Sequence, residues 1–280
     1  MDDQSGSRKP LGIFDSGVGG LSVLRAIRHE LPNEDLLYFG DQAHVPYGPR
    51  SLSEVRKLSE GVVQFLLDEG AKLIVVACNT ASAAALHFLR ETFLDVPFVG
   101  MEPAVKPAAE HTQTGKVGVL ATPATFQGEL YASVVERFAQ SVVIFQDTCP
   151  GLVGQIENGK LNARRTRDIL MRALEPMLGE GIDTIVLGCT HYPFVIPLIQ
   201  EIAGPEVQVI DPAPAVARQV RRILERNQIL NTNSATGKLD LFTSGNPASL
   251  SQLLPMLISD LGEVRAVAWR REMKVVRRVS

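Results

Sequence analysis

Short apolar runs rich in Val and Ile alternate with longer amphipathic segments along almost the whole of this 280-residue chain, and few folds are compatible with that order. The short runs have the length of buried strands, whereas the longer segments have apolar residues at helical spacing. This alternation predicts an α/β fold with mostly parallel sheets, in which functional sites form at the carboxyl ends of the strands. The expected strands are residues 11–15, 35–40, 73–78, 96–100, 116–121, 141–146, 183–188, 207–211, 238–243 and 263–269. The expected helices are residues 19–31, 51–69, 81–93, 103–111, 125–139, 163–179, 192–203, 213–228 and 247–259.

Two of the expected strands are similar in sequence. Residues 69–78 read EGAKLIVVAC and residues 180–189 read EGIDTIVLGC, and in both copies the cysteine is followed by polar residues. A weaker similarity relates residues 11–16 to residues 117–122, although chance similarity between apolar strands is an alternative there. The repeat predicts two similar α/β units, each with a thiol at the carboxyl end of a strand.

The length of 280 residues suits two domains or one large domain. The length and the repeat together predict two α/β domains related by a pseudo-two-fold axis, with the functional site in the cleft between them. We expect the first domain to comprise residues 1–99 and 211–280, with residues 1–10 disordered, and the second domain to comprise residues 100–210.

The composition is that of an ordinary globular protein, with 45% hydrophobic and 21% charged residues. A net charge of −3 gives no reason to expect nucleic-acid binding. We see no signal peptide and no apolar run long enough to span a membrane. Three cysteines argue against a disulfide framework and favour a reducing cytoplasm. We expect the basic cluster at the C-terminus to be a solvated tail or an edge strand; it consists of Arg270, Arg271, Lys274, Arg277 and Arg278.

The stretch GIFDSGVGGLS, residues 12–22, resembles a phosphate-binding loop, but it lacks the third glycine of a dinucleotide fingerprint and the lysine of a P-loop. What remains is a tight turn with amides at the start of a helix, preceded by Asp15 and Ser16. Such a helix start favours an anion, and a carboxylate serves as well as a phosphate. The glycines alone favour the simpler interpretation, a tight strand-to-helix turn.

The two repeated cysteines, Cys78 and Cys189, are the strongest candidates for chemistry, since a thiolate can act as a nucleophile, a base or a metal ligand. A zinc site is disfavoured because the spacing of Cys189 and His191 is poor and no Cys-x-x-Cys occurs. A hydrolase with Cys189 as nucleophile and His191 as base leaves Cys78 unexplained. Two equivalent thiols on opposite faces of a substrate carbon fit a proton transfer that inverts the carbon. The usual thiol pKa makes both protonation states accessible near neutral pH.

The motifs at these positions resemble those of the glutamate racemase family. CNTA within ACNTAS and the motif GCTHYP, at the ends of the repeated strands, are specific. The resemblance implies interconversion of L- and D-glutamate by two-base proton transfer without pyridoxal phosphate, any other cofactor or a metal. The motifs occur in order along the chain and are FDSGVGG (14–20), FGD (39–41), VPYG (45–48), ACNTAS (77–82) and GCTHYP (188–193).

The resemblance implies that Cys78 removes the proton from D-glutamate and that Cys189 removes it from L-glutamate. Asp15 would lie near Cys78, and His191 and Glu157 near Cys189. Few basic residues lie in these motifs, so we expect amides and hydroxyls to bind the substrate carboxylates. The residues expected to contact substrate are Asp15, Ser16, Tyr47, Gly48, Asn79, Thr80, Thr122, Thr125, Thr190 and His191.

The resemblance further implies a cytoplasmic homodimer that supplies D-glutamate for peptidoglycan synthesis and has no nucleic-acid or membrane partner. Two alternatives stay open. One is a racemase or isomerase of the same superfamily, the aspartate/glutamate racemases, that acts on aspartate or another dicarboxylate, and the other is a glutamate-binding regulator without catalysis. Outside the motifs, we expect Cys149 to serve packing and His44 to be a loop residue.

Overall fold

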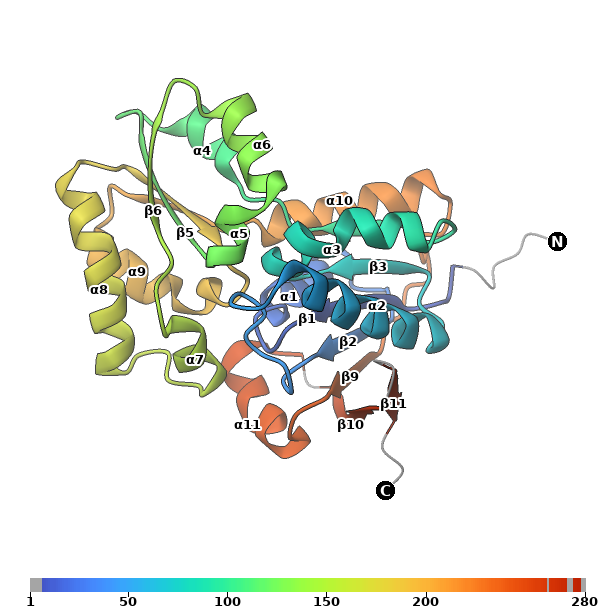
Figure 1. Cartoon of the computed structure of the whole chain (residues 1–280). Helices are drawn as coiled ribbons and strands as arrows, with labels where there is room; N and C mark the ends of the chain where they lie inside the picture. Colours follow the sequence, from blue (N-terminus) through green and yellow to red (C-terminus); the bar gives the residue numbers. More distant parts are fainter. Residues whose placement is uncertain (1–6, 261, 271–273, 278–280) are drawn as a thin grey trace.

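The computed structural model describes residues 7–260, 262–270 and 274–277. Its strands form two sheets, of which the larger has the order β11-β10-β9-β2-β1-β3-β4 and the smaller the order β6-β5-β7-β8 (Figure 1). All neighbouring strands are parallel except β10 and β11. The predicted α/β fold with mostly parallel sheets is therefore confirmed. The strands of the larger sheet are β1 (Leu11–Asp15), β2 (Leu36–Gly40), β3 (Leu73–Val76), β4 (Phe98–Gly100), β9 (Leu239–Thr243), β10 (Glu263–Trp269) and β11 (Val275–Arg277). Those of the smaller sheet are β5 (Lys116–Ala121), β6 (Val143–Asp147), β7 (Thr184–Gly188) and β8 (Gln208–Ile210).

Each sheet and its helices form one lobe of the molecule (Figure 1). The first lobe consists of the larger sheet with α1 (Leu21–Glu30), α2 (Leu52–Asp68), α3 (Asn79–Thr92), α10 (Ala213–Arg226) and α11 (Pro247–Leu257). The second lobe consists of the smaller sheet with α4 (Val105–His111), α5 (Pro123–Gln127), α6 (Glu129–Phe138), α7 (Leu152–Glu157), α8 (Arg164–Gly179), a 3-10 helix (Tyr192–Val195) and α9 (Ile196–Ala203). Sheet membership follows the expected division of the chain, while the domain boundaries themselves stay a prediction.

The internal repeat is confirmed by the strand order and the register. β2-β1-β3-β4 in the first lobe has the same order as β6-β5-β7-β8 in the second. Leu11 pairs with Leu73 in the first lobe, and Val117 pairs with Thr184 in the second, so the weaker similarity also marks equivalent strands. The strands that precede Cys78 and Cys189 therefore occupy equivalent places in the two lobes.

Two expected helices differ from those of the structure, and one helix of the structure was not expected. The helix expected at residues 125–139 is divided into α5 and α6, because Gly128 takes an extended conformation. The helix expected at residues 192–203 begins as a 3-10 turn that contains Pro193. Helix α7 was not expected, since six residues are too few to show a helical period. In the basic C-terminal cluster, Arg277 lies on the edge strand β11, whereas Arg271 and Arg278 lie outside the described residues.

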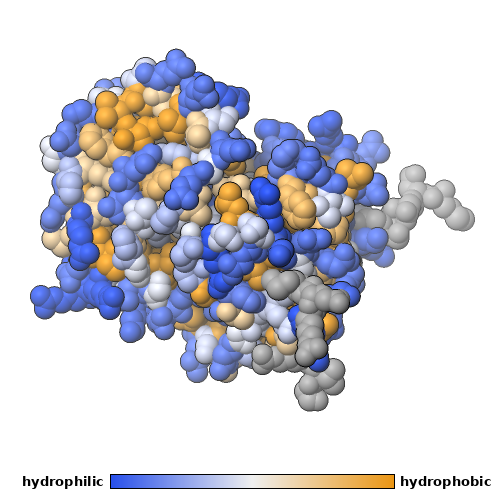
Figure 2. Space-filling view, viewed as in Figure 1, coloured by the Kyte–Doolittle hydropathy of each residue, from blue (hydrophilic) through white to orange (hydrophobic). Residues whose placement is uncertain are grey.

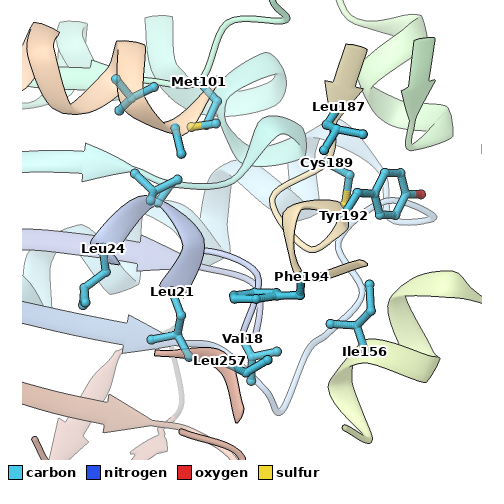
Figure 3. Close-up of a cluster of buried hydrophobic side chains, with 14 of the residues drawn as sticks. Val18, Leu21, Leu24, Met101, Ile156, Leu187, Cys189, Tyr192, Phe194 and Leu257 are labelled. Atoms are coloured by element: carbon cyan, nitrogen blue, oxygen red, sulfur yellow. The ribbon is translucent and has the colours of Figure 1, made fainter. Parts of the chain in front are cut away.

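A single hydrophobic cluster joins the two lobes. Val18 and Leu21 from the first lobe lie beside Phe194 from the second, and Leu187 and Ile156 complete that side (Figure 3). Hydrophilic residues cover most of the face shown in Figure 2, and the larger hydrophobic areas lie on the second lobe. Burial of apolar surface thus holds the carboxyl ends of both sheets together.

Two expectations concern the ends and the surroundings of the chain. The expected disorder of residues 1–10 falls mainly on residues 1–6, which lie outside the described residues. Within the described residues, no helix combines the length and the apolar character required to cross a membrane.

Candidate active site

The two repeated cysteines meet at one cavity between the lobes. Cys78 follows β3 and caps α3, where its sulfur accepts a hydrogen bond from the Ala81 amide at 3.5 Å. Cys189 follows β7 in the equivalent place. Both thiols are buried, and both line the same cavity. The juxtaposition expected from the repeat is therefore present.

The wall of this cavity contains most of the residues expected to contact substrate. They are Ser16, Tyr47, Gly48, Asn79, Thr80, Thr122, Thr190 and His191, and they lie together with Pro46 and Val153, which were not expected. Asp15, Thr125 and Glu157 are not in the wall. The cavity has a volume of about 20 Å³, which is room for about one water molecule. This cavity must therefore widen before an amino acid of the size of glutamate can enter.

Cys189 lies beside a buried imidazole–carboxylate pair. Its sulfur is 3.8 Å from Nδ1 of His191, and Nε2 of His191 is 2.6 Å from Oε1 of Glu157. Burial opposes protonation of His191, but its hydrogen bonds with Cys189 and Glu157 outweigh burial and raise its pKa well above the usual value. Burial likewise opposes ionisation of Glu157, but its hydrogen bond and charge interaction with His191 lower the pKa of this carboxyl group. Both shifts favour an imidazolium–carboxylate pair, with the imidazole ring next to the Cys189 sulfur.

Cys78 has a different environment. Burial, followed by the charge of Asp15, raises the pKa of the Cys78 thiol well above its usual value. Asp15 is itself fully buried, and its oxygens accept hydrogen bonds from the Gly17 amide at 2.8 Å and from the Thr190 hydroxyl at 3.1 Å. Burial also raises the pKa of Asp15. The surroundings of Cys78 thus favour the neutral thiol.

The glycine-rich loop supports the imidazole–carboxylate pair. The Val18 amide donates a hydrogen bond of 2.8 Å to Oε1 of Glu157, so a carboxylate of the chain itself binds at this loop. A Cβ atom on Gly17 would lie 1.9 Å from that oxygen, and one on Gly19 would lie 2.4 Å from Nδ1 of His191. Gly17 and Gly19 therefore provide space for two side chains, a role that the sequence did not predict.

Several polar groups of the wall are suited to bind a small polar molecule. Asn79 lines the cavity, yet its buried amide oxygen and nitrogen have no hydrogen-bond partner among the described residues. Such a group costs about 1–3 kcal/mol when it has no partner, and it is therefore expected to bind a ligand. The hydroxyls of Thr80, Thr122 and Thr125 form a chain across the two lobes, with 2.9 Å between neighbouring oxygens. Of the described residues, no lysine or arginine lines the cavity.

Tyr47 is held over the cavity by Asp41. The Tyr47 hydroxyl donates a hydrogen bond of 2.7 Å to Asp41, whose oxygens also accept from Ser244 at 2.6 Å and from Trp269 at 2.8 Å. His44 contacts the same carboxylate and packs edge-on against Trp269, so it is the loop residue that the sequence predicted. Burial and the Asp41 charge raise the pKa of Tyr47 well above its usual value, so its hydroxyl remains a donor.

A protein-family model described as "Asp/Glu/Hydantoin racemase" matches residues 17–220. The chain belongs to this racemase family. Racemases are isomerases, so the protein is an enzyme of the isomerase class. Within the described residues, no group of three or more His, Cys, Asp and Glu side chains is arranged to hold a metal ion.

Individual racemases are similar over nearly the whole chain. A glutamate racemase of Roseiflexus sp. (strain RS-1) is 50% identical over 258 residues, which are 92% of this chain and 94% of that protein. The crystal structure of a glutamate racemase isoform from Bacillus anthracis has a TM-score of 0.84 at 34% identity, covering 96% of this chain and 100% of that chain. That of the Escherichia coli glutamate racemase, in complex with L-glutamate and the activator UDP-MurNAc-ala, has a TM-score of 0.81 at 33% identity, covering 96% and 99%.

Some residues around the racemase cavity were not assigned a role from the sequence. Asp41 belongs to the FGD motif, but nothing in the motif shows that its carboxylate binds four side chains. Trp269 lies far from the motifs in the sequence and gave no signal. Cys149 is buried in the hydrophobic cluster, as expected.

Proposed function

We propose that this racemase interconverts L- and D-glutamate by two-base proton transfer at the α-carbon, with Cys78 and Cys189 as the two bases. The observation that carries the proposal is that two buried thiols, at equivalent strand ends of two repeated lobes, line one cavity. A substrate held between them presents opposite faces of its α-carbon to the two sulfurs. Two-base inversion of that carbon requires this arrangement.

The unequal surroundings of the thiols indicate their starting roles. The His191 imidazolium lies 3.8 Å from the Cys189 sulfur, and an adjacent cation favours the thiolate. Cys78 is held as a thiol by burial and by the charge of Asp15. We therefore propose that Cys78 starts as the thiol, with Cys189 as the base, when the enzyme converts L-glutamate.

In that direction, the Cys189 thiolate takes the α-proton and leaves the electron pair on the α-carbon and its carboxylate. The Cys78 thiol then gives its proton to the opposite face, which yields D-glutamate with Cys189 as thiol and Cys78 as thiolate. Reaction from D-glutamate runs through the same steps in reverse. Asn79, Thr80 and Thr190 lie where they can stabilise the charge that develops on the α-carboxylate.

Three further parts of the proposal rest on the family resemblance: the enzyme works in the cytoplasm, acts as a homodimer and supplies D-glutamate for peptidoglycan synthesis. The racemase activity itself is tested by incubating the protein with L-glutamate, without added cofactor, and following the loss of optical rotation. In deuterated water, deuterium is expected at the α-carbon of the product. A regulator that only binds glutamate would cause no exchange.

The two-base mechanism is tested by Cys78→Ala and Cys189→Ala, both of which are expected to abolish racemisation. Cys149→Ala is the matched control, because it removes the third buried thiol, which does not line the cavity. Racemisation retained by either variant at the two candidate bases would exclude the mechanism. Faster turnover of L-aspartate than of L-glutamate by the unaltered protein would favour the alternative substrate.

A further inference from the structure

Gln42 connects the first lobe to the imidazole–carboxylate pair of the second. Its amide nitrogen donates a hydrogen bond of 3.2 Å to Oε2 of Glu157, the carboxylate oxygen that does not contact His191. Its amide oxygen accepts a hydrogen bond of 2.8 Å from the hydroxyl of Thr243, the last residue of β9. Gln42 directly follows the FGD motif and does not line the cavity.

The neighbours of Gln42 determine which way its amide group faces. The Thr243 oxygen already accepts a hydrogen bond from the Gly245 amide at 2.9 Å, so its own proton is free to be donated to Gln42. The Glu157 carboxylate can only accept. With a donor on one side and an acceptor on the other, the amide has a single favourable orientation, in which its NH₂ group faces Glu157.

We propose that Gln42 is a positioning residue for the Cys189 half of the reaction, which keeps Glu157 ionised and directed at His191. In addition to its contact with His191, Glu157 accepts one hydrogen bond at each carboxylate oxygen, from the Val18 amide at Oε1 and from Gln42 at Oε2. Both donors come from the first lobe, so the charge beside Cys189 depends on contact between the lobes. The expected change in kcat/KM rests on the proposed racemase function, whereas the expected change in the His191 titration does not.

Other ionisable groups interact with the pair, namely Cys189, Asp15 and Tyr38. His191 is influenced by Cys189, Glu157 and Asp15, and Glu157 is also coupled to Tyr38 of β2. Burial raises the pKa of Tyr38 well above its usual value, so it stays neutral. Gln42 is therefore a neutral side-chain donor, and its replacement can change the pair without changing the net charge.

The test uses Gln42→Met, which keeps the length of the side chain but cannot donate a hydrogen bond. Gln64→Met is the matched control, since Gln64 donates to the exposed Asp68 carboxylate at 2.9 Å on α2, away from the cavity. Loss of the donor is expected to raise the pKa of Glu157, and to lower that of His191 because the carboxylate is then free to turn away from the imidazole. His191 is titrated by NMR in the full-length protein, and its signal is assigned with a His191→Asn variant.

For activity, we expect kcat/KM of Gln42→Met to fall about tenfold, the usual effect of one hydrogen bond to a charged group. L- and D-glutamate are mirror images with equal free energies, so kcat/KM must fall equally for both. The pH profile of kcat/KM is expected to narrow, with its acid limb at higher pH and its alkaline limb at lower pH. Gln64→Met should match the parent in every measurement.

An unchanged His191 titration in Gln42→Met would overturn the proposal, as would a uniform loss of activity at all pH values with no shift of either limb. If the parent protein proved unable to racemise glutamate, the NMR titration would still decide the role of Gln42. Should Gln42→Met fail to fold, Thr243→Val tests the same contact, because it removes the donor that orients the amide. A shift of the His191 titration in the same direction is then expected.

Discussion

The close contact between the glycine-rich loop and Glu157 makes Gly17→Ala an informative substitution. The new Cβ would lie 1.9 Å from Oε1 and 2.7 Å from the carboxyl carbon of Glu157. Gly17 does not have a positive φ, so the backbone itself tolerates alanine. The Glu157 carboxylate must therefore move away, and it then loses its contacts with the Val18 amide and with His191, which are 2.8 and 2.6 Å long.

The size of the effect follows from those two contacts. A hydrogen bond to a charged group contributes about 1.5–3 kcal/mol, but a displaced carboxylate regains part of this from water or from Gln42. A net loss of about 2–3 kcal/mol in transition-state stabilisation corresponds to about a 30- to 160-fold fall in kcat/KM. Since the loop itself is unstrained, we expect the melting temperature to fall by only a few degrees.

Gly154→Ala is the matched control for this substitution. Gly154 lies on the same helix as Glu157, and a Cβ atom there would meet nothing within 4 Å. Alanine in a helix is favoured over glycine by about 0.5–1 kcal/mol, so this variant should be slightly more stable and fully active. Racemisation of glutamate and thermal unfolding are measured for both variants. Full activity of Gly17→Ala would refute the reasoning, because it would mean that the position of Glu157 does not matter.

Three further substitutions test the cavity and its surroundings. Asn79→Leu replaces a buried amide that has no hydrogen-bond partner in the described part of the chain, and it is expected to stabilise the ligand-free protein by about 1–3 kcal/mol while weakening glutamate binding. Denaturant unfolding and calorimetric titration measure the two effects, and a destabilised variant would contradict this interpretation. Glu157→Gln should lower the melting temperature most between pH 4.5 and 6.5, the ordinary pKa values of the two partners. The stabilisation that comes from the lowered Glu157 pKa is lost as pH falls below that window, and the stabilisation that comes from the raised His191 pKa is lost as pH rises above it. A difference in melting temperature between parent and variant that does not depend on pH would be inconsistent with an ion pair. Trp269, the single tryptophan of the chain, donates a hydrogen bond to Asp41, which also holds Tyr47 at the cavity. Binding of glutamate is therefore expected to change the fluorescence of Trp269. An unchanged emission during a saturating titration would show that this part of the cavity wall does not respond to glutamate.

The fold could be predicted from the sequence because the strands have strong, local signals. The strands of both sheets that end at the cavity are buried, apart from Lys116 at the start of β5, and the sequence alone shows their continuous apolar runs. The repeat at residues 69–78 and 180–189 then placed the two thiols at equivalent strand ends. Helix α7, which carries Glu157, was not predicted because it is short.

The contacts of the candidate site were less accessible, because they join residues far apart in sequence. Glu157 contacts Val18 and Gln42 across the lobes, and these pairs have no local pattern. Neither the single orientation of the Gln42 amide nor the unpartnered amide of Asn79 can be read from a motif, since both depend on what the neighbouring atoms do. The family resemblance supplied most residues of the cavity wall, and the structure adds how they are held.

The small volume of the closed cavity has a kinetic consequence. Racemisation changes neither the size nor the charge of its substrate, so the product is enclosed as completely as the substrate was. Release therefore requires the same widening of the cavity as entry, against contacts such as that between the hydroxyls of Thr80 and Thr122. Turnover in either direction cannot exceed the rate at which the cavity opens with the product inside.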